Sequence, residues 1–344
     1  MKKTFLFGFF FILVNFVSLP RTVYRPPDPC MPYITVNWVN DKTTYKLSSY
    51  HLDEYPLFEL FDKNYLEKHQ LPKIISPRYK PETKIETAKL STLIEEVLQE
   101  IAQGKQQFKN FKILTCKDFN FKTKYGLIIL KFKDYPFVVK LFIETPQGFV
   151  RPFDKGIEPI FFFFMGRGAS RHLSGFTRLK NREYIKAHLE KSPWATVVDV
   201  PRKWYWLPSN AKWIEIKGFN FKKRNITTQF PGTYCIIADA IEAERIPSLW
   251  NNNDKKLALN ICNYLDLWVD PHMKNFMFEK QTQKFVIVDT EHFPSFTGLK
   301  EKIKFNSYLS WYVFLAMECF KTTFLQTKLE RRNPRIRNRS MRLS

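Results

Sequence analysis

Four polar side chains in the last third of the chain have the types and the spacing that phosphoryl transfer requires. Asp270, His272 and Asn275 lie close together in sequence, and Asp289 follows the apolar run 285–288. A carboxylate aimed at a hydroxyl group can take its proton, and amide and carboxylate oxygens bind a hard divalent cation such as Mg²⁺. A tight loop between two short strands would bring these groups to one point. The sequence therefore predicts that Asp270, Asn275 and Asp289 converge.

The order Asp-x-His-x-x-Asn, followed by a strand that ends in Asp, resembles the catalytic and metal-binding loops of the protein-kinase-like superfamily. Its form is closest to the branch of aminoglycoside and other small-molecule phosphotransferases. The resemblance implies that Asp270 positions and deprotonates a hydroxyl acceptor, while His272 braces the loop. It implies that Asn275 and Asp289 hold Mg²⁺ and that ATP supplies the phosphoryl group. The implied fold is α+β and bilobal and kinase-like, with an antiparallel sheet in the N-lobe and a short, mainly helical C-lobe.

Three upstream segments have the composition of strands: 111–116, 125–132 and 137–143. The resemblance places a lysine that grips the α- and β-phosphates in the third of these strands, where Lys140 lies. A solvent-facing lysine on an edge strand is the alternative interpretation of Lys140. The glycine-rich loop that should cover the phosphates is missing, because residues 117–124 contain no glycine and only Gly126 follows. Three lysines of that stretch could replace part of the loop's function: Lys117, Lys122 and Lys124.

Glu183 is the residue that the resemblance pairs with Lys140. It lies in a predicted helix over residues 176–189, and an ion pair with the lysine would orient Lys140 toward the nucleotide. The two residues are far apart in sequence for the family, so this assignment requires an insertion near residues 144–173.

The segments around the Asp270 loop follow the order that the resemblance implies. We predict a hairpin, a buried strand that runs into an acidic segment, and two helices: 196–200 with 203–207, 233–242, 254–268 capped by Asp254, and 306 to about 325. The first of these helices leads directly into Asp270. After Asp289, Thr290 and Glu291 stand where the family has Phe-Gly, and no Ala-Pro-Glu ending of a peptide-docking segment follows. These departures disfavour an ordinary protein kinase.

The two ends of the chain differ from its middle. Residues 1–20 contain two lysines and then an apolar run, the pattern of a signal peptide or an N-terminal anchor, which predicts export or membrane association. The segment has no clear small-x-small cleavage site, and a buried N-terminal segment of a cytoplasmic protein is the alternative. Residues 21–105 are expected to form a proline- and aromatic-rich extension, irregular up to residue 83 and helical over 87–103. The predicted N-lobe, C-lobe and basic tail are residues 106–240, 241–327 and 328–344.

The composition favours a folded core and attraction to polyanions. Hydrophobic residues make up 44% of the 344 residues, which is enough for a sizeable core. The formal charge of +22 predicts attraction to nucleotide phosphates, anionic lipid or nucleic acid, and does not choose among them. The basic C-terminal tail is a candidate contact for an anionic membrane surface, and nucleic acid is less favoured. The five cysteines are widely spaced without a C-x-x-C pair, so neither a zinc site nor a dense disulfide framework is predicted.

Three functions stay open on the sequence. The first is Mg²⁺-dependent transfer of the γ-phosphoryl group of ATP to an unidentified hydroxyl acceptor. The second is a secreted or membrane-associated kinase-like binding protein without catalysis, which the missing glycine loop and the Asp-Thr-Glu sequence favour. The third is a basic protein on an unrelated α+β fold that binds membrane surfaces or nucleic acid.

Overall fold

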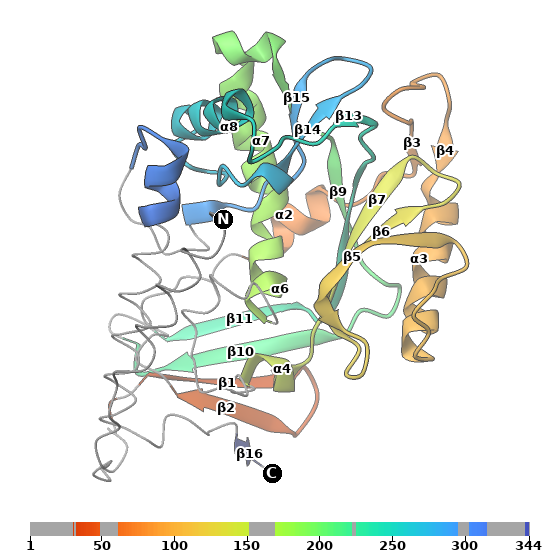
Figure 1. The fold of residues 1–344 in the computed structure, drawn as a ribbon. Coiled ribbons are helices and arrows are strands. Elements are labelled where there is room, and N and C mark those ends of the chain that lie inside the picture. The colour runs from red at the N-terminus through yellow and green to blue at the C-terminus, as the bar shows by residue number, and fades with distance from the viewer. Residues whose placement is uncertain are drawn as a thin grey trace, which may run out of the picture.

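The structure is a computed structural model that describes residue 30 and residues 32–48, 61–150, 169–221, 225–294, 303–314 and 341–343. These residues form a mixed α+β structure in which the sheets are built mainly from antiparallel strands (Figure 1). The α+β class predicted from the sequence is thereby confirmed. The predicted export segment 1–20 and most of the predicted basic tail lie outside the described residues. Within the described residues, none of the helices has the length and apolar character needed to span a membrane.

The main sheet, which carries Lys140, has five antiparallel strands in the order β5-β6-β7-β12-β9. Their bounds are Phe111–Asn120 (β5), Tyr125–Phe132 (β6), Phe137–Ile143 (β7), Thr233–Asp239 (β12) and Lys203–Trp206 (β9). The sequence predictions of the first three strands and of the buried strand are confirmed. The β-branched and aromatic residues that fill these strands suit a sheet that is covered on both faces.

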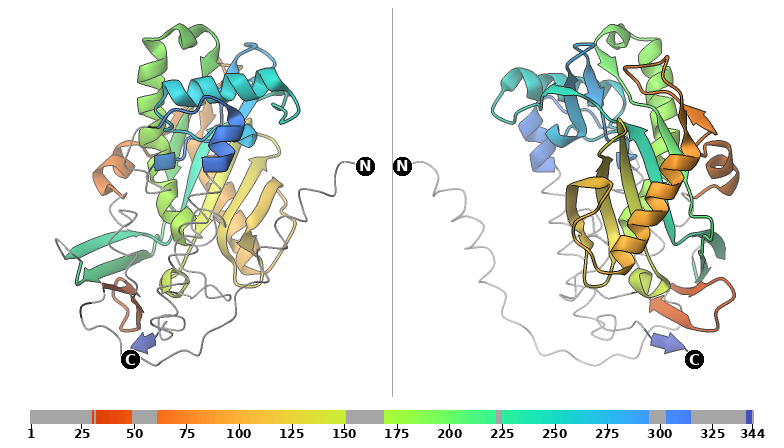
Figure 2. Two further views of the ribbon diagram at one scale, coloured as in Figure 1. Left: turned by 60° about the vertical axis from the view of Figure 1, so that its left-hand side comes forward. Right: turned by 90° about the vertical axis from the view of Figure 1, so that its right-hand side faces the viewer.

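Helices cover both faces of the main sheet. On one face lies α3 (Thr87–Ala102), whose buried side chains Leu90, Ile94 and Val97 recur at helical spacing and pack against Ile128 of β6. The right-hand view of Figure 2 shows α3 in orange along the yellow strands. On the other face lie α6 (Ala169–Gly175) and α7 (Thr177–Glu190), which contribute apolar side chains to a second cluster. The predicted helices over 87–103 and 176–189 are therefore confirmed.

A second five-stranded sheet brings together segments that are far apart in sequence. Its order is β11-β10-β1-β2-β16, with bounds Ile226–Pro231 (β11), Trp213–Phe219 (β10), Tyr33–Trp38 (β1), Thr44–Ser48 (β2) and Met341–Leu343 (β16). The expectation of an irregular chain up to residue 83 was wrong for β1 and β2. Burial alternates along β1, where Ile34 and Val36 face the core, and this short period was obscured by the surrounding prolines.

The hairpin predicted from 196–200 and 203–207 does not form. The first segment yields β8 (Val198–Asp199), which pairs in parallel with β15 (Phe285–Ile287), whereas β9 pairs with β12. Each of the two segments pairs with a strand from a distant part of the chain instead of with the other segment, so they enter different sheets. The sheet that contains β8 has the order β13-β14-β15-β8, with β13 at Ala243–Arg245 and β14 at Phe276–Glu279.

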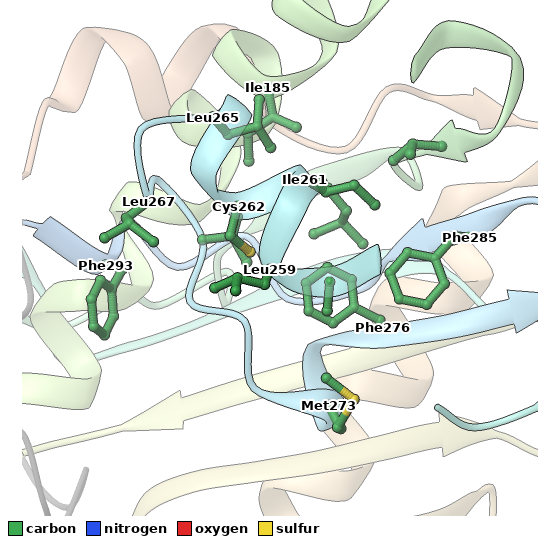
Figure 3. Close-up of a cluster of buried hydrophobic side chains, with 14 of the residues drawn as sticks. Ile185, Leu259, Ile261, Cys262, Leu265, Leu267, Met273, Phe276, Phe285 and Phe293 are labelled. Atoms are coloured by element: carbon green, nitrogen blue, oxygen red, sulfur yellow. The ribbon is translucent and has the colours of Figure 1, made fainter. Parts of the chain in front are cut away.

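A third hydrophobic cluster supports the segment that carries Asp270. It joins Ile185 of α7 to side chains of α8 (Asn252–Tyr264), including Leu259 and Ile261, and to Phe276 and Phe285 of the β14–β15 hairpin (Figure 3). The predicted Asp254 cap was wrong, because Asn251 caps α8 through its side chain and Asp254 lies inside the first turn. The helix ends at Tyr264, before the predicted residue 268. Residues 308–314 are helical, within the segment predicted as the last helix.

The remaining short elements connect these layers. They are α2 (Lys63–Lys68), β3 (Ile74–Ile75), β4 (Ile85–Glu86), α4 (Pro146–Val150), and the 3-10 turns η3 (Pro193–Thr196) and η4 (Met273–Asn275). Residues 69–71 run beside the edge strand β9, where Tyr205 donates its N–H to the carbonyl of His69 and accepts from the N–H of Leu71. Part of the predicted extension is thus built into the edge of the main sheet.

Candidate active site

Asp270 lies at the start of the loop that follows α8. The chain leaves the helix through Asp266 and Leu267, which both have positive φ, and then turns toward the β14–β15 hairpin. The Oδ1 atom of Asp270 accepts from the backbone N–H of His272 at 3.1 Å and from Nδ2 of Asn275. Nδ2 of Asn275 also contacts the carbonyl oxygen of Asp270 at 3.2 Å. The loop is therefore closed by bonds between two of the predicted site residues.

His272 shapes the same loop from its own backbone and ring. Its Nδ1 atom accepts from the N–H of Lys274 at 3.2 Å and so caps η4, which places the ring proton on Nε2. Burial and the nearby cations Lys274 and Lys117 lower the pKa of His272 below its ordinary value. In the structure His272 therefore acts as the N-cap of η4, within the loop that carries Asp270.

The β14–β15 hairpin brings Asn275 next to Asp289. Phe276 pairs with Ile287 in the antiparallel register, so Asn275 lies opposite Val288, the residue before Asp289. The carbonyl oxygen of Asn275 accepts from the N–H of Val288 at 2.8 Å and from that of Asp289 at 3.4 Å. The predicted convergence of the two loops follows from this register.

Lys140 and Arg178 both contact the carboxylate of Asp289. Nζ of Lys140 lies 3.2 Å from Oδ2, and Nη1 of Arg178 contacts Oδ1. Lys140 is on an internal strand and is 9% exposed, so it is not a solvent-facing lysine of an edge strand. Although burial opposes ionisation, Arg178 and Lys140 hold the pKa of Asp289 well below its ordinary value. Asp289 is therefore an anion that the protein itself stabilises.

Glu291 extends this network away from the Asp270 loop. Its Oε1 atom lies 3.0 Å from Nη2 of Arg178 and also accepts from the hydroxyl of Ser174. Its Oε2 atom lies 2.6 Å from Nη1 of Arg171 on α6. The Asp-Thr-Glu sequence that departs from the family pattern thus supplies two anions, and α6 and α7 supply the arginines that pair with them.

A second buried lysine holds the residue between these two anions. Nζ of Lys203, on β9, donates to Oγ1 of Thr290 at 2.6 Å and to the carbonyl oxygen of Val288 at 3.2 Å. Burial and the positive charge of Lys140 lower the pKa of Lys203 well below its ordinary value. The hydrogen-bond partners of Lys203 are thus a hydroxyl and a carbonyl oxygen of the segment that carries Asp289.

Glu183 is the predicted site residue that the structure does not bring to Lys140. Its Oε2 atom accepts from the hydroxyl of Tyr65 at 2.5 Å, and its Oε1 atom lies 2.9 Å from Nε2 of His69. Both partners belong to α2 and its C-terminal end, and the Glu183 side chain is 45% exposed. Glu183 therefore fastens the N-terminal extension to the outer side of α7.

Two ionisable groups of the site have pKa values shifted toward neutrality. Burial raises the pKa of Asp270 from 3.8 to about 7, and the charges of Asp289 and Glu291 add to the rise, while the N–H of His272 opposes it. Burial lowers the pKa of Lys140 from 10.5 to about 8, although Asp289 opposes this shift. A carboxyl group with a pKa near 7 can accept a proton at physiological pH, as a general base must.

The donor atoms present fit Mg²⁺ better than a transition metal. The amide oxygen of Asn275 and the carboxylate of Asp289 are hard oxygen ligands on facing ends of one hairpin. Among the residues described by the structure, no group of three or more His, Cys, Asp and Glu side chains is arranged to hold a metal ion. One carboxylate and one amide match the way in which Mg²⁺ usually binds, with phosphate oxygens and water as its other ligands.

The β5–β6 hairpin stands where the resemblance expects the phosphate loop. Gly126 has a φ of +111°, and a Cβ atom there would lie 2.1 Å from the carbonyl oxygen of Asp118, so this glycine serves the hairpin's own geometry. Nζ of Lys124 donates to the carbonyl oxygen of Ala102 at the end of α3. Of the three candidate lysines, Lys117 has an electrostatic effect on His272. The positive charge of Lys117 therefore acts on one of the predicted site residues.

Comparisons of the chain with models of protein families, with curated proteins and with solved structures gave no significant match. The function is therefore argued from the geometry of the site.

Proposed function

We propose that the protein is a kinase-like phosphotransferase that moves the γ-phosphoryl group of ATP to a hydroxyl acceptor with the help of Mg²⁺. The proposal rests on two contacts between predicted site residues. Asp270 accepts a hydrogen bond from Asn275, and Lys140 forms an ion pair with Asp289. They come from one loop, one hairpin end and one internal strand. These residue types occur in the chain order that the resemblance implies, and they can supply a base, a phosphate-binding cation and two oxygen ligands for Mg²⁺.

The order of the elements supports a kinase-like arrangement of two lobes. The main sheet has its lysine in the third strand, and α7 lies between the third and the fourth strand in chain order. The fifth strand leads to α8, the Asp270 loop and the β14–β15 hairpin, which share a hydrophobic cluster with Ile185 and Leu189 of α7. Figure 1 places this second group of elements beside one end of the main sheet.

In the proposed reaction Asp270 accepts the proton of the acceptor hydroxyl. The hydroxyl oxygen then forms a bond to the γ-phosphorus while the bond from that phosphorus to the β–γ bridging oxygen breaks, so that ADP leaves. Lys140 neutralises charge on the nucleotide phosphates. Asn275 and Asp289 would hold Mg²⁺, which screens the phosphate charge when it is bound. The pKa of about 7 suits Asp270 to this role, because about half of the groups are ionised at neutral pH.

The first test is thermal unfolding of the whole chain with ATP, with and without Mg²⁺. At about a hundred times its dissociation constant a ligand adds roughly 2.7 kcal/mol of stability, which is a shift of several degrees. We expect a Mg²⁺-dependent rise that Asp289→Asn abolishes and the matched control Glu183→Gln keeps. No Mg²⁺-dependent rise at millimolar ATP in the wild type would overturn the proposal.

The second test separates catalysis from binding. Asp270→Asn should keep the Mg²⁺-dependent rise and lose transfer of the γ-phosphoryl group from labelled ATP to a mixture of hydroxyl compounds, including small molecules and the protein's own side chains. Binding by the wild type without any transfer or hydrolysis would instead identify a kinase-like binding protein. That alternative is favoured by one observation, namely that both oxygens of Asp289 are already paired with Lys140 and Arg178.

A further inference from the structure

We infer that Arg178 positions Asp289. Arg178 lies on α7 next to the site, where the resemblance would place the glutamate of this helix that pairs with Lys140. This inference deepens the proposed function and, in its consequence for Mg²⁺, rests on it. Arg178 is 1% exposed and reaches Asp289 and Glu291 with the two terminal nitrogens of one planar group. A guanidinium group can hold two carboxylates in fixed relative positions, which an ammonium group cannot do as well.

Helix α7 contacts the whole segment that carries Asp289. Besides the ion pair of Arg178, Nδ2 of Asn181 donates to the carbonyl oxygen of Thr290 at 3.1 Å. Oγ1 of Thr290 donates to the carbonyl oxygen of Arg178 at 2.6 Å, and Oγ1 of Thr177 accepts from the N–H of His292 at 3.0 Å. Residues 289–292 are therefore bonded to the helix at every position, by side chain or by backbone.

The same helix also supports the loop of the proposed base. Nδ2 of Asn181 donates to the carbonyl oxygen of Trp268 at 2.9 Å, two residues before Asp270. One buried amide thus connects the Asp270 loop with the Asp289 segment. A shift of α7 would move both groups together, so the helix fixes their relative position.

Arg178 affects the ion pairing of Lys140. Because Glu183 does not reach Lys140, the ion-pair partner of Lys140 among the described residues is Asp289. When Lys140 turns to a nucleotide phosphate, Asp289 keeps Arg178 as a partner, and Glu291 balances the charge of Arg178. Asp289 should therefore stay ionised and in place before and after the nucleotide binds.

The test compares Arg178→Met and Arg178→Lys with the control Arg245→Met, which breaks an ion pair with Asp254 elsewhere. The first measurement is amide hydrogen exchange over residues 286–292 in the protein without nucleotide. We expect exchange there to quicken at least about tenfold in Arg178→Met, and less in Arg178→Lys, which keeps the charge and loses the fork. In Arg245→Met the exchange of this segment should match that of the wild type.

The second measurement is the Mg²⁺ concentration that gives half of the ATP-dependent thermal shift. A positioning role predicts a rise of about tenfold or more in Arg178→Met, partly reversed in Arg178→Lys, with little change in the binding of ATP without Mg²⁺. A role confined to overall stability predicts a lower melting temperature with an unchanged Mg²⁺ concentration, and this result would overturn the inference.

The two measurements keep the inference apart from the proposed function. Absence of any nucleotide effect in the wild type would refute the phosphotransferase, whereas hydrogen exchange needs no nucleotide and still decides whether Arg178 fixes the segment. If Arg178→Met fails to fold, Arg178→Lys and Glu291→Gln provide the same comparison. Glu291→Gln is included because it removes the second carboxylate that pairs with the guanidinium group of Arg178. Wild-type exchange in both variants would contradict the inference.

Discussion

Replacing Asp270 with Asn should stabilise the folded protein at alkaline pH while it removes the proposed base. The pKa of this carboxyl rises from 3.8 to about 7 on folding, chiefly because partial burial removes water from the charged form. An acid with a raised pKa in the folded state destabilises that state when it is ionised, and stability falls as the pH rises from about 4 to about 7. Asparagine carries no charge, and its Oδ1 atom can still accept from His272 and Asn275.

The expected size follows from the two pKa values. At pH 8 the ionised carboxyl costs up to about 4 kcal/mol, and at pH 4 the cost is about 0.5 kcal/mol. For a chain of this length, about 4 kcal/mol corresponds to roughly 6 °C in the melting temperature. Asp270→Asn should therefore melt several degrees above the wild type at pH 8, and the difference should nearly vanish at pH 4.

The assay is thermal or urea unfolding at pH 8, 6 and 4 without nucleotide. Asp254→Asn is the matched control, because hydrogen bonds from Arg245 lower the pKa of Asp254 although burial opposes them. A lowered pKa in the folded state adds stability above the ordinary pKa, so this variant should lose stability at pH 8. The reasoning is refuted if Asp270→Asn is less stable than the wild type at pH 8, or if its gain does not depend on pH.

Three further predictions concern the site and its support. Glu183→Gln should leave the affinity for Mg²⁺-ATP within about twofold of the wild type, because Glu183 does not contact Lys140; a loss of about tenfold or more, measured by calorimetry, would contradict this placement. The rate of phosphoryl transfer should be bell-shaped in pH, falling below about 7 as Asp270 is protonated and above about 8 as Lys140 loses its proton; a rate that is flat between pH 6 and 9 would exclude these groups. Gly126→Ala should cost more than about 1 kcal/mol in urea unfolding, since the new methyl group would collide with the carbonyl of Asp118 at a positive φ; wild-type stability would show that the hairpin adapts.

The elements with a clear hydrophobic period were predictable from the sequence. The helix α3 repeats apolar residues at helical spacing, and the strands β6, β7 and β12 are nearly continuous apolar runs. The errors occurred where pairing is decided by distant parts of the chain. No local pattern indicates that β8 pairs with β15, or that β1 pairs with β10, which lies far along the sequence.

The site was predictable where its residues are neighbours in sequence, and less so across the fold. Asp270, Asn275 and Asp289 belong to one loop and one hairpin, and Lys140 was found through its apolar strand. Glu183 was assigned through the resemblance, as the carboxylate of the predicted helix over residues 176–189, although the sequence contained a signal against it.

That signal is the buried face of α7. Asn181, Ile185 and Leu189 recur at helical spacing and are buried, and Arg178 lies on the same face one turn earlier. Glu183 falls outside this series and is exposed. Projection of the helix would have placed Arg178, and not Glu183, on the buried face, but the ion pairs of Arg178 with Asp289 and Glu291 depend on the tertiary structure.

The proposed catalysis gives a purpose to one feature of the site that the alternative of binding alone leaves unexplained. A buried ion-pair network such as that of Arg178, Asp289 and Glu291 usually adds little net stability, because desolvation offsets the attraction, and apolar side chains often serve as well. Stability therefore does not explain why these charges are buried at this place. Binding of Mg²⁺ and ATP would explain why Asp289 and Lys140 are charged at this place. It would not explain why the protein keeps Asp270, whose raised pKa lowers the stability of the folded state when the group is ionised. A carboxyl group held near pH 7 beside a candidate metal ligand has a use in proton transfer, and this is why we place the phosphotransferase ahead of the binding protein.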